Sequence, residues 1–138
     1  MTREELKAAA VAMLDRAYIP YSHFPVGAAL ECSDGTVFTG CNIENASFGP
    51  TICAERTAVA KAVSEGHRDF VRIVIAGRSR ELCVPCGVCR QVMMEFCQPN
   101  AFRIILAGSP DQPKSYTLDE LLPLGFGPEN LSGNQPDC

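Results

Sequence analysis

The sequence predicts an α/β fold of three α-β-α layers, in which helices cover both faces of a mixed central sheet. The first indication is the order of the apolar patterns, which alternate between strand and helix along most of the chain. The second is that residues 71–76 and 102–107 are short, continuous apolar runs, which are typical of strands buried on both faces. Parallel strands of this kind need crossover helices, and those helices must pack against the sheet.

The first third of the chain predicts a helix followed by a hairpin. Apolar residues recur at helical spacing over residues 3–17, and Pro20 then ends the helix. Two apolar runs at 26–32 and 37–41 flank an Asp-Gly pair at residues 34–35, which is a strong signal for a tight turn. These runs are therefore expected to form two antiparallel strands.

Two more helices are expected beside the buried strands. Residues 53–65 are rich in alanine and are followed by Gly66, a residue that commonly ends a helix. Residues 85–97 begin with a proline, which suits the first turn of a helix, and they carry an apolar stripe. The polar residues 127–138 contain glycine and proline, and we expect a loose tail there. The whole chain, residues 1–138, is thus expected to form a single domain.

The composition indicates the environment of the protein. With 138 residues, 46% of them hydrophobic, the chain can bury a core without disulfides. Its first residues are charged where a signal peptide would be apolar, and no apolar run could span a bilayer, so we expect a cytoplasmic protein without a membrane partner. In the reducing cytosol, the eight cysteines are expected to be metal ligands, catalytic groups or core residues. A net charge of −4 disfavours a nucleic-acid partner and favours a small substrate without phosphates.

Three cysteines stand at predicted helix starts. Cys86 and Cys89 lie three residues apart on one face of a first turn, where the helix dipole favours the thiolate that binds metals. Cys53 opens the preceding helix, two residues before Glu55. If the two helix ends meet at one metal ion, three thiolates would hold zinc and leave its fourth position for water, as in catalytic zinc sites.

Two other classes of protein could use some of these residues. A structural zinc module would need four protein ligands, and it has no use for Glu55 beside a ligand. A thiol oxidoreductase could use Cys86 and Cys89 without a third cysteine or a metal. Zinc content, and the effect of zinc removal on activity, separate these alternatives from a zinc enzyme.

Several motifs together resemble one enzyme family. The motif Cys53-Ala54-Glu55, followed by Pro-Cys-Gly-Val-Cys at residues 85–89, resembles the zinc signature of the cytidine deaminase superfamily. Within this superfamily the chain resembles the short, homotetrameric cytidine deaminases in particular, over roughly residues 18–131. Their further motifs resemble residues 22–30, 40–45, 53–58, 121–123 and 126–129.

The resemblance implies a zinc enzyme of pyrimidine salvage, which hydrolyses cytidine and deoxycytidine to uridine and deoxyuridine and releases ammonia. Cys53, Cys86 and Cys89 would bind one zinc ion per chain, which lowers the pKa of a water molecule. Glu55 would move protons from this water to ring nitrogen 3 of the base. A deaminase of a cytosine-nucleoside antibiotic shares the zinc motifs and is the nearest alternative.

The resemblance also implies a nucleoside site that neighbouring subunits share. Phe24 would pack near the base, and the backbone N–H of Ala54 would contact the carbonyl of the base. Asn42 and Glu44 would hydrogen-bond to the 3′-hydroxyl of the ribose. Phe126 would reach the site of a neighbouring subunit, and we therefore expect a homotetramer.

A few residues near these motifs stand apart. Three thiolates around zinc give a net charge of about −1, and Arg56 can offset this charge by donating hydrogen bonds to the ligand sulfurs. Relatives often carry tyrosine where this chain has Phe48, so one expected contact to the ribose 5′-hydroxyl is missing. Cys83, Arg90 and Gln91 lie close to the zinc motif, but the sequence assigns them no role.

Overall fold

The strands of the computed structural model form one five-stranded sheet. The structure describes residues 1–78, 82–107 and 114–131. The strands are β1 (Val26–Cys32), β2 (Val37–Cys41), β3 (Phe70–Gly77), β4 (Arg103–Ala107) and β5 (Lys114–Thr117). Their order across the sheet is β2-β1-β3-β4-β5, and neighbouring strands are antiparallel except for β3 and β4, which are parallel. The prediction of a mixed sheet is confirmed.

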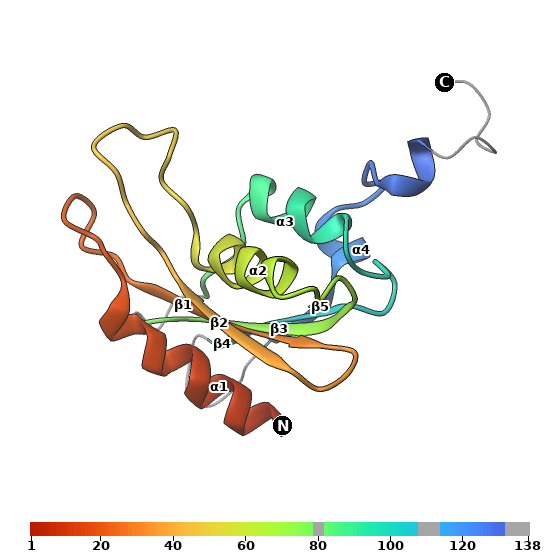
Figure 1. The fold of residues 1–138 in the computed structure, drawn as a ribbon, viewed down its shortest axis with the longest axis horizontal. Helices are drawn as coiled ribbons and strands as arrows, with labels where there is room; N and C mark the ends of the chain where they lie inside the picture. The colour runs from red at the N-terminus through yellow and green to blue at the C-terminus, as the bar shows by residue number, and fades with distance from the viewer. Residues whose placement is uncertain (79–81, 108–113, 132–138) are drawn as a thin grey trace.

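Helices cover both faces of this sheet. They are α1 (Arg3–Ala12), α2 (Ala54–Ser64), α3 (Gly87–Met94) and α4 (Leu118–Leu121), with short 3-10 helices η1 (Met13–Arg16) and η2 (Pro128–Leu131). Figure 1 shows α1 on one face of the sheet and α2 and α3 on the other, which confirms the three layers. The strands joined by α2 and α3 run in the same direction in each case, as crossover connections require.

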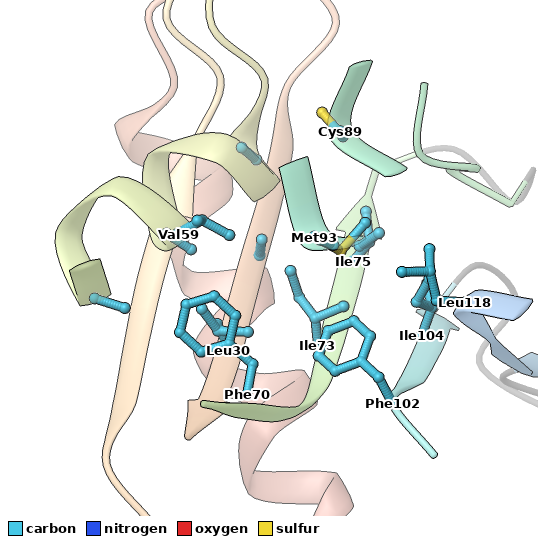
Figure 2. Packing of buried hydrophobic residues seen from close by; sticks show 14 of the residues in the cluster. Leu30, Val59, Phe70, Ile73, Ile75, Cys89, Met93, Phe102, Ile104 and Leu118 are labelled. Atoms are coloured by element: carbon cyan, nitrogen blue, oxygen red, sulfur yellow. The ribbon is translucent and has the colours of Figure 1, made fainter. Parts of the chain in front are cut away.

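The core consists of two layers because successive side chains of a strand point to opposite faces. Ile73 and Ile75 of β3 pack beneath α2 and α3, together with Met93 (Figure 2). Val74, between them in sequence, faces α1 and packs near Leu6. All five side chains are buried. Strands with helices on both sides have no solvated face, which explains the continuous apolar runs in the sequence.

A glycine allows α2 to lie directly on the sheet. A Cβ atom at Gly40 would be 2.3 Å from the carbonyl oxygen of Ala54 and 2.6 Å from the nitrogen of Ala58. Both distances are shorter than atoms can approach, so only glycine fits at this point of β2. The contact sets the position of the start of α2, where four predicted site residues follow one another: Cys53, Ala54, Glu55 and Arg56.

The boundaries of two predicted helices differ from the structure. The first helix was expected to reach residue 17, but α1 ends at Ala12 and the chain tightens into η1. The third was expected to reach residue 97, but α3 ends at Met94. For this third helix the reason is tertiary pairing, since the carbonyl oxygen of Phe96 accepts a hydrogen bond from the backbone N–H of Phe70 at the start of β3.

The C-terminal part of the chain contains structure that the sequence did not predict. Strand β5 and helix α4 follow one another, and a capping box of Thr117 and Glu120 starts the helix. The loose tail expected from Gly127 is wrong for residues 128–131, which form η2, and residues 132–138 lie outside the described residues. Within the described residues, no helix combines the length and apolar character needed to cross a bilayer.

Candidate active site

Three thiols meet where the first turns of α2 and α3 approach each other. Cys53 is the N-cap residue of α2, Cys86 is the N-cap residue of α3, and Cys89 lies in the first turn of α3. The Sγ atom of Cys86 is 3.8 Å from that of Cys53 and 3.4 Å from that of Cys89, and all three lie within 4.8 Å of one another. Zinc–sulfur bonds of about 2.3 Å at tetrahedral angles separate ligand sulfurs by roughly 3.8 Å. The cluster therefore fits a zinc ion.

The local sequence explains why the sulfurs converge. Cys53 and Cys86 both have extended backbones (ψ of 158° and 166°), as N-cap residues do. Pro85 precedes Cys86, where its missing N–H costs no hydrogen bond of the helix. The Sγ atom of Cys86 also accepts the backbone N–H of Cys89 at 3.4 Å, so it takes the place of a capping hydroxyl. Both helix starts thus direct a sulfur toward the same point.

The thiols influence one another electrostatically. The adjoining Cys89 thiol and, to a smaller extent, Arg56 lower the pKa of Cys53 to about 5. The same contact with Cys53, together with burial, raises the pKa of Cys89. One negative charge is therefore favoured in the cluster and a second is opposed. A divalent cation removes that opposition, because it stabilises all three sulfurs as thiolates.

Arg56 lies against the cluster, as the charge argument from the sequence requires. Its Nη2 atom donates to the Sγ atom of Cys53 at 3.5 Å, one helical turn away. Its Nε atom is buried and has no hydrogen-bond partner within the described part of the chain. The guanidinium group therefore lies beside a sulfur, in a partly buried position.

Glu55 is the buried charged residue of the described core. Its side chain is only 4% exposed, although a carboxylate at the start of a helix usually lies in water. Burial raises the pKa of Glu55 above its ordinary value. A carboxyl group whose pKa lies closer to neutrality can both accept and return a proton, which is what general acid–base catalysis needs.

A cavity of about 360 Å³ opens beside the thiols and Glu55. Its volume lies at the lower end of the range for small-molecule sites. The predicted site residues that line it are Phe24, Asn42, Glu44, Cys53, Ala54, Glu55 and Cys86. A larger hollow of about 910 Å³ lies between the end of α3 and the C-terminal segment, but it contains neither the thiols nor Glu55. Chemistry therefore points to the smaller cavity as the active site.

Comparison with known proteins shows the family of the chain. Residues 1–104 match the family model described as the cytidine and deoxycytidylate deaminase zinc-binding region. The chain belongs to the cytidine and deoxycytidylate deaminase family. It is 46% identical over 132 residues to the cytidine deaminase of Halalkalibacterium halodurans, covering 96% of this chain and 99% of that protein. It is 47% identical to the probable cytidine deaminase of Dictyostelium discoideum, covering 95% and 90%.

Solved structures lead to the same family. The crystal structure of cytidine deaminase from Burkholderia pseudomallei superposes with a TM-score of 0.85 at 44% identity, over 91% of this chain and all of that one. The cytidine deaminase of Mycobacterium tuberculosis gives a TM-score of 0.78 at 37% identity, over 92% and 98%. The family resemblance and the fold class predicted from the sequence are confirmed.

Two polar residues of the deaminase cavity also hold the loop that carries Phe24. The amide of Asn42 donates through Nδ2 to the carbonyl oxygen of Phe24 at 2.8 Å and accepts through Oδ1 from the backbone N–H of Val26 at 2.9 Å. Oε1 of Glu44 accepts the backbone N–H groups of Tyr21 and Ser22 at 3.0 and 3.1 Å. Contacts between a side chain and the backbone sixteen or more residues away leave no local pattern, so the sequence did not indicate this second role.

The hydrogen bonds to Glu44 also fix its charge. Those from Ser22 and Tyr21 hold the pKa of Glu44 below its ordinary value. Glu44 is therefore ionised at neutral pH, and a carboxylate there can accept a hydrogen bond from a hydroxyl of the substrate. An anionic wall would also repel a phosphate, in keeping with the expected uncharged nucleoside.

Phe126 does not reach the cavity of its own chain. Its side chain is 54% exposed, in the segment between α4 and η2. The carbonyl oxygen of Phe126 accepts a hydrogen bond from Nε2 of Gln91 in α3 at 2.7 Å. Phe48 is 85% exposed. Both aromatic rings are therefore free to contact a second chain.

Cys83 lies in the wall of the cavity, outside the cluster of three thiols. Its sulfur packs against Gly77, where an added Cβ atom would be only 2.5 Å away. Burial raises the pKa of Cys83, so this thiol is neutral at physiological pH. A neutral thiol is a poor nucleophile, and the sulfur of Cys83 does not belong to the group of three that could share a metal ion, so Cys83 is part of the cavity wall.

Proposed function

We propose that the protein is a zinc-dependent cytidine deaminase, which converts cytidine and deoxycytidine to uridine and deoxyuridine and releases ammonia. The observation that carries this proposal is the buried carboxyl group of Glu55 beside three converging thiols, in the wall of a cavity of nucleoside size. The names of the relatives support it. Three protein ligands are the number typical of catalytic zinc sites, whereas structural sites use four, so a structural zinc module is disfavoured.

Glu55 would carry the proton transfers. Zinc held by Cys53, Cys86 and Cys89 would supply a water molecule of lowered pKa for attack on carbon 4 of the cytosine ring. Glu55 would accept a proton from this water, deliver it to ring nitrogen 3, and then help ammonia to leave. Its burial raises the pKa of Glu55 and so favours the protonated form more than water would, which assists the step in which Glu55 takes up a proton.

The rest of the cavity would orient the nucleoside. Ala54 is the first residue of α2, where a backbone N–H has no acceptor within the helix and can donate to the carbonyl of the base. Phe24, held by Asn42, would pack near the base. Asn42 and Glu44 would bind the 3′-hydroxyl of the ribose. They would use the lone pairs of their side-chain oxygens, and the amide hydrogen of Asn42, that are not engaged by the loop.

Ammonia release from a panel of substrates tests the proposed activity. The zinc-loaded protein should release ammonia from cytidine and deoxycytidine, and far more slowly from CMP or adenosine. A cytosine-nucleoside antibiotic belongs in the same panel, because preference for it over cytidine would replace the proposed substrate. Zinc-loaded protein that releases no ammonia from either cytosine nucleoside would contradict the proposal.

We also propose that four chains assemble and complete one another's active sites. Phe24, Phe48 and Phe126 are each about half exposed or more, and large apolar side chains left exposed on a surface can mark a protein–protein interface. Light scattering at assay concentration should therefore give a mass of about four times the 14.9 kDa of one chain. Full activity in a monomer at that concentration would rule out shared sites.

The proposed tetramer would work in the cytoplasm. Seven cysteines of the described residues are free thiols, and three of them form the metal cluster. A reducing compartment keeps thiols available as ligands, whereas an oxidising one would pair them.

Replacing Arg56 tests the charge balance of the metal site. Arg56→Gln is expected to keep the fold and most of the zinc, to lower turnover, and to move the acid limb of the pH–rate profile to higher pH. Without the guanidinium group the thiolates carry more negative charge, which raises the pKa of the water at zinc. Adding Cys53→His should restore part of the loss, because it replaces a thiolate with a neutral ligand.

The control for this variant is Arg3→Gln, at an exposed position in α1 on the opposite face of the sheet, which should behave like the parent. Parallel zinc analysis distinguishes a charge effect from simple loss of metal. The charge-balance role is wrong if Arg56→Gln has the turnover, zinc content and pH profile of the parent.

A further inference from the structure

Arg90, to which the sequence assigned no role, joins the metal-binding turn to another helix. Its Nε atom donates to the carbonyl oxygen of Pro85 at 2.8 Å, and its Nη1 atom donates to the carbonyl oxygen of Leu121, the last residue of α4, at 2.6 Å. The side chain is partly buried between the two helices. One guanidinium group therefore bonds two backbone carbonyls that lie more than thirty residues apart.

The Pro85 carbonyl lies next to a predicted zinc ligand. Pro85 is fully buried and directly precedes Cys86, so the peptide unit that Arg90 bonds is the one that leads into Cys86. Pro85 lies outside α3, and the N–H of Cys89 in the first turn bonds to the Cys86 sulfur. Without Arg90 a buried carbonyl would lose a charged donor, and the peptide unit could rotate.

The other end of the bridge holds the turn in place. The carbonyl of Leu121 is at the C-terminal end of α4, where carbonyl groups lack partners within the helix and favour a positive charge. Helix α4 is anchored in turn, since Leu118 is fully buried in the core beneath α3 (Figure 2). Arg90 therefore connects the turn that contains Cys86 to a helix that is anchored in the core.

We propose that Arg90 is a positioning residue for the metal site, which holds the Pro85–Cys86 peptide so that the Cys86 sulfur stays in place to bind zinc. This inference rests on the proposed zinc site. Under this inference, each of the two N-cap ligands is supported by an arginine of the helix that it starts. Arg56 contacts the sulfur of Cys53, whereas Arg90 contacts the backbone beside Cys86. The two arginines act differently, one on the charge of a ligand and the other on its position.

The test is the rate at which the zinc-loaded full chain releases zinc to an excess of a chromogenic chelator. Arg90→Met keeps most of the aliphatic packing and removes both hydrogen bonds, and zinc release should become roughly 10-fold faster or more, the effect common for residues that support metal ligands. Arg90→Lys keeps the charge but cannot hold both carbonyls as a planar fork does, so it should fall between the parent and Arg90→Met.

Two controls separate positioning from general loss of stability. Arg78→Met removes an arginine whose ion pair with Asp15 is exposed, and it should release zinc at the rate of the parent. Val74→Ala weakens the core on the α1 face, so its melting temperature should fall while its zinc release, measured well below that temperature, stays unchanged.

A spectroscopic measurement completes the test. Cobalt-loaded Arg90→Met should show shifted thiolate-to-cobalt absorption bands, while cobalt-loaded Val74→Ala should show the bands of the parent. If Arg90→Met and Arg90→Lys both release zinc at the rate of the parent with unchanged cobalt bands, the inference is overturned and the proposed function stands. A parent protein that binds no zinc tightly would overturn both.

Discussion

Glu55→Gln is expected to leave zinc bound and to lower the turnover of cytidine by a factor of about 100 to 10,000, the contribution common for a positioned proton-transfer group. Glutamine has nearly the size and shape of glutamate, so the buried position at the start of α2 stays filled. It cannot accept a proton from water or return one to the ring. The thiol cluster is untouched, so the loss should appear in kcat with zinc content unchanged.

The measurement is steady-state ammonia release, with zinc analysed in the same samples. Glu65→Gln is the matched control, because Glu65 is an exposed glutamate at the opposite end of α2 and should leave turnover as it is in the parent. Near-normal turnover in the Glu55→Gln variant would contradict the assignment of Glu55 as the proton carrier, whatever the zinc content of the variant.

Cys89→Ala and Cys86→Ala are each expected to abolish tight zinc binding and, with it, deaminase activity. Two remaining thiolates hold a divalent ion far more weakly than three, and the loss of one ligand leaves the cluster incomplete. Cys89 lies within the core, so its replacement also tests whether a fully buried thiol can be a ligand. Metal analysis after gel filtration, together with ammonia release, measures both effects.

The matched control is Cys97→Ala. Cys97 is another partly buried thiol close to α3, but burial raises its pKa to about 12 and it lies outside the cluster. Zinc content and activity should therefore stay at the level of the parent. Equimolar zinc with full activity in Cys89→Ala would show that the cluster of three thiols is not the metal site.

The main elements of the sheet and its helices could be predicted because their signals are local. The Asp-Gly turn defines the hairpin of β1 and β2, and the continuous apolar runs of β3 and β4 require cover on both faces. Strand β5 gave no such signal. It has four residues, two of them exposed, and it lies at the edge of the sheet. It forms by antiparallel pairing with β4, a pairing that no local pattern of β5 indicates.

The candidate site divides in the same way. The thiols of Cys86 and Cys89 and their proximity follow from spacing at a helix start, and the motif containing Cys53 indicated a third sulfur. The sequence could not say that Arg90 bonds to the carbonyl of Leu121, or that Asn42 holds the backbone of Phe24, because both contacts join residues distant in the chain.

The sequence by itself determined the class of the fold, the helix starts that carry the sulfurs, and the family. These depend on periodicity, turn chemistry and ligand spacing, which act over a few residues. Only the tertiary structure decided the insertion of β1 between β2 and β3, the burial of Glu55, and the hydrogen bonds that hold the loop of Phe24. These depend on which distant segments pack together, and packing is a property of the whole core.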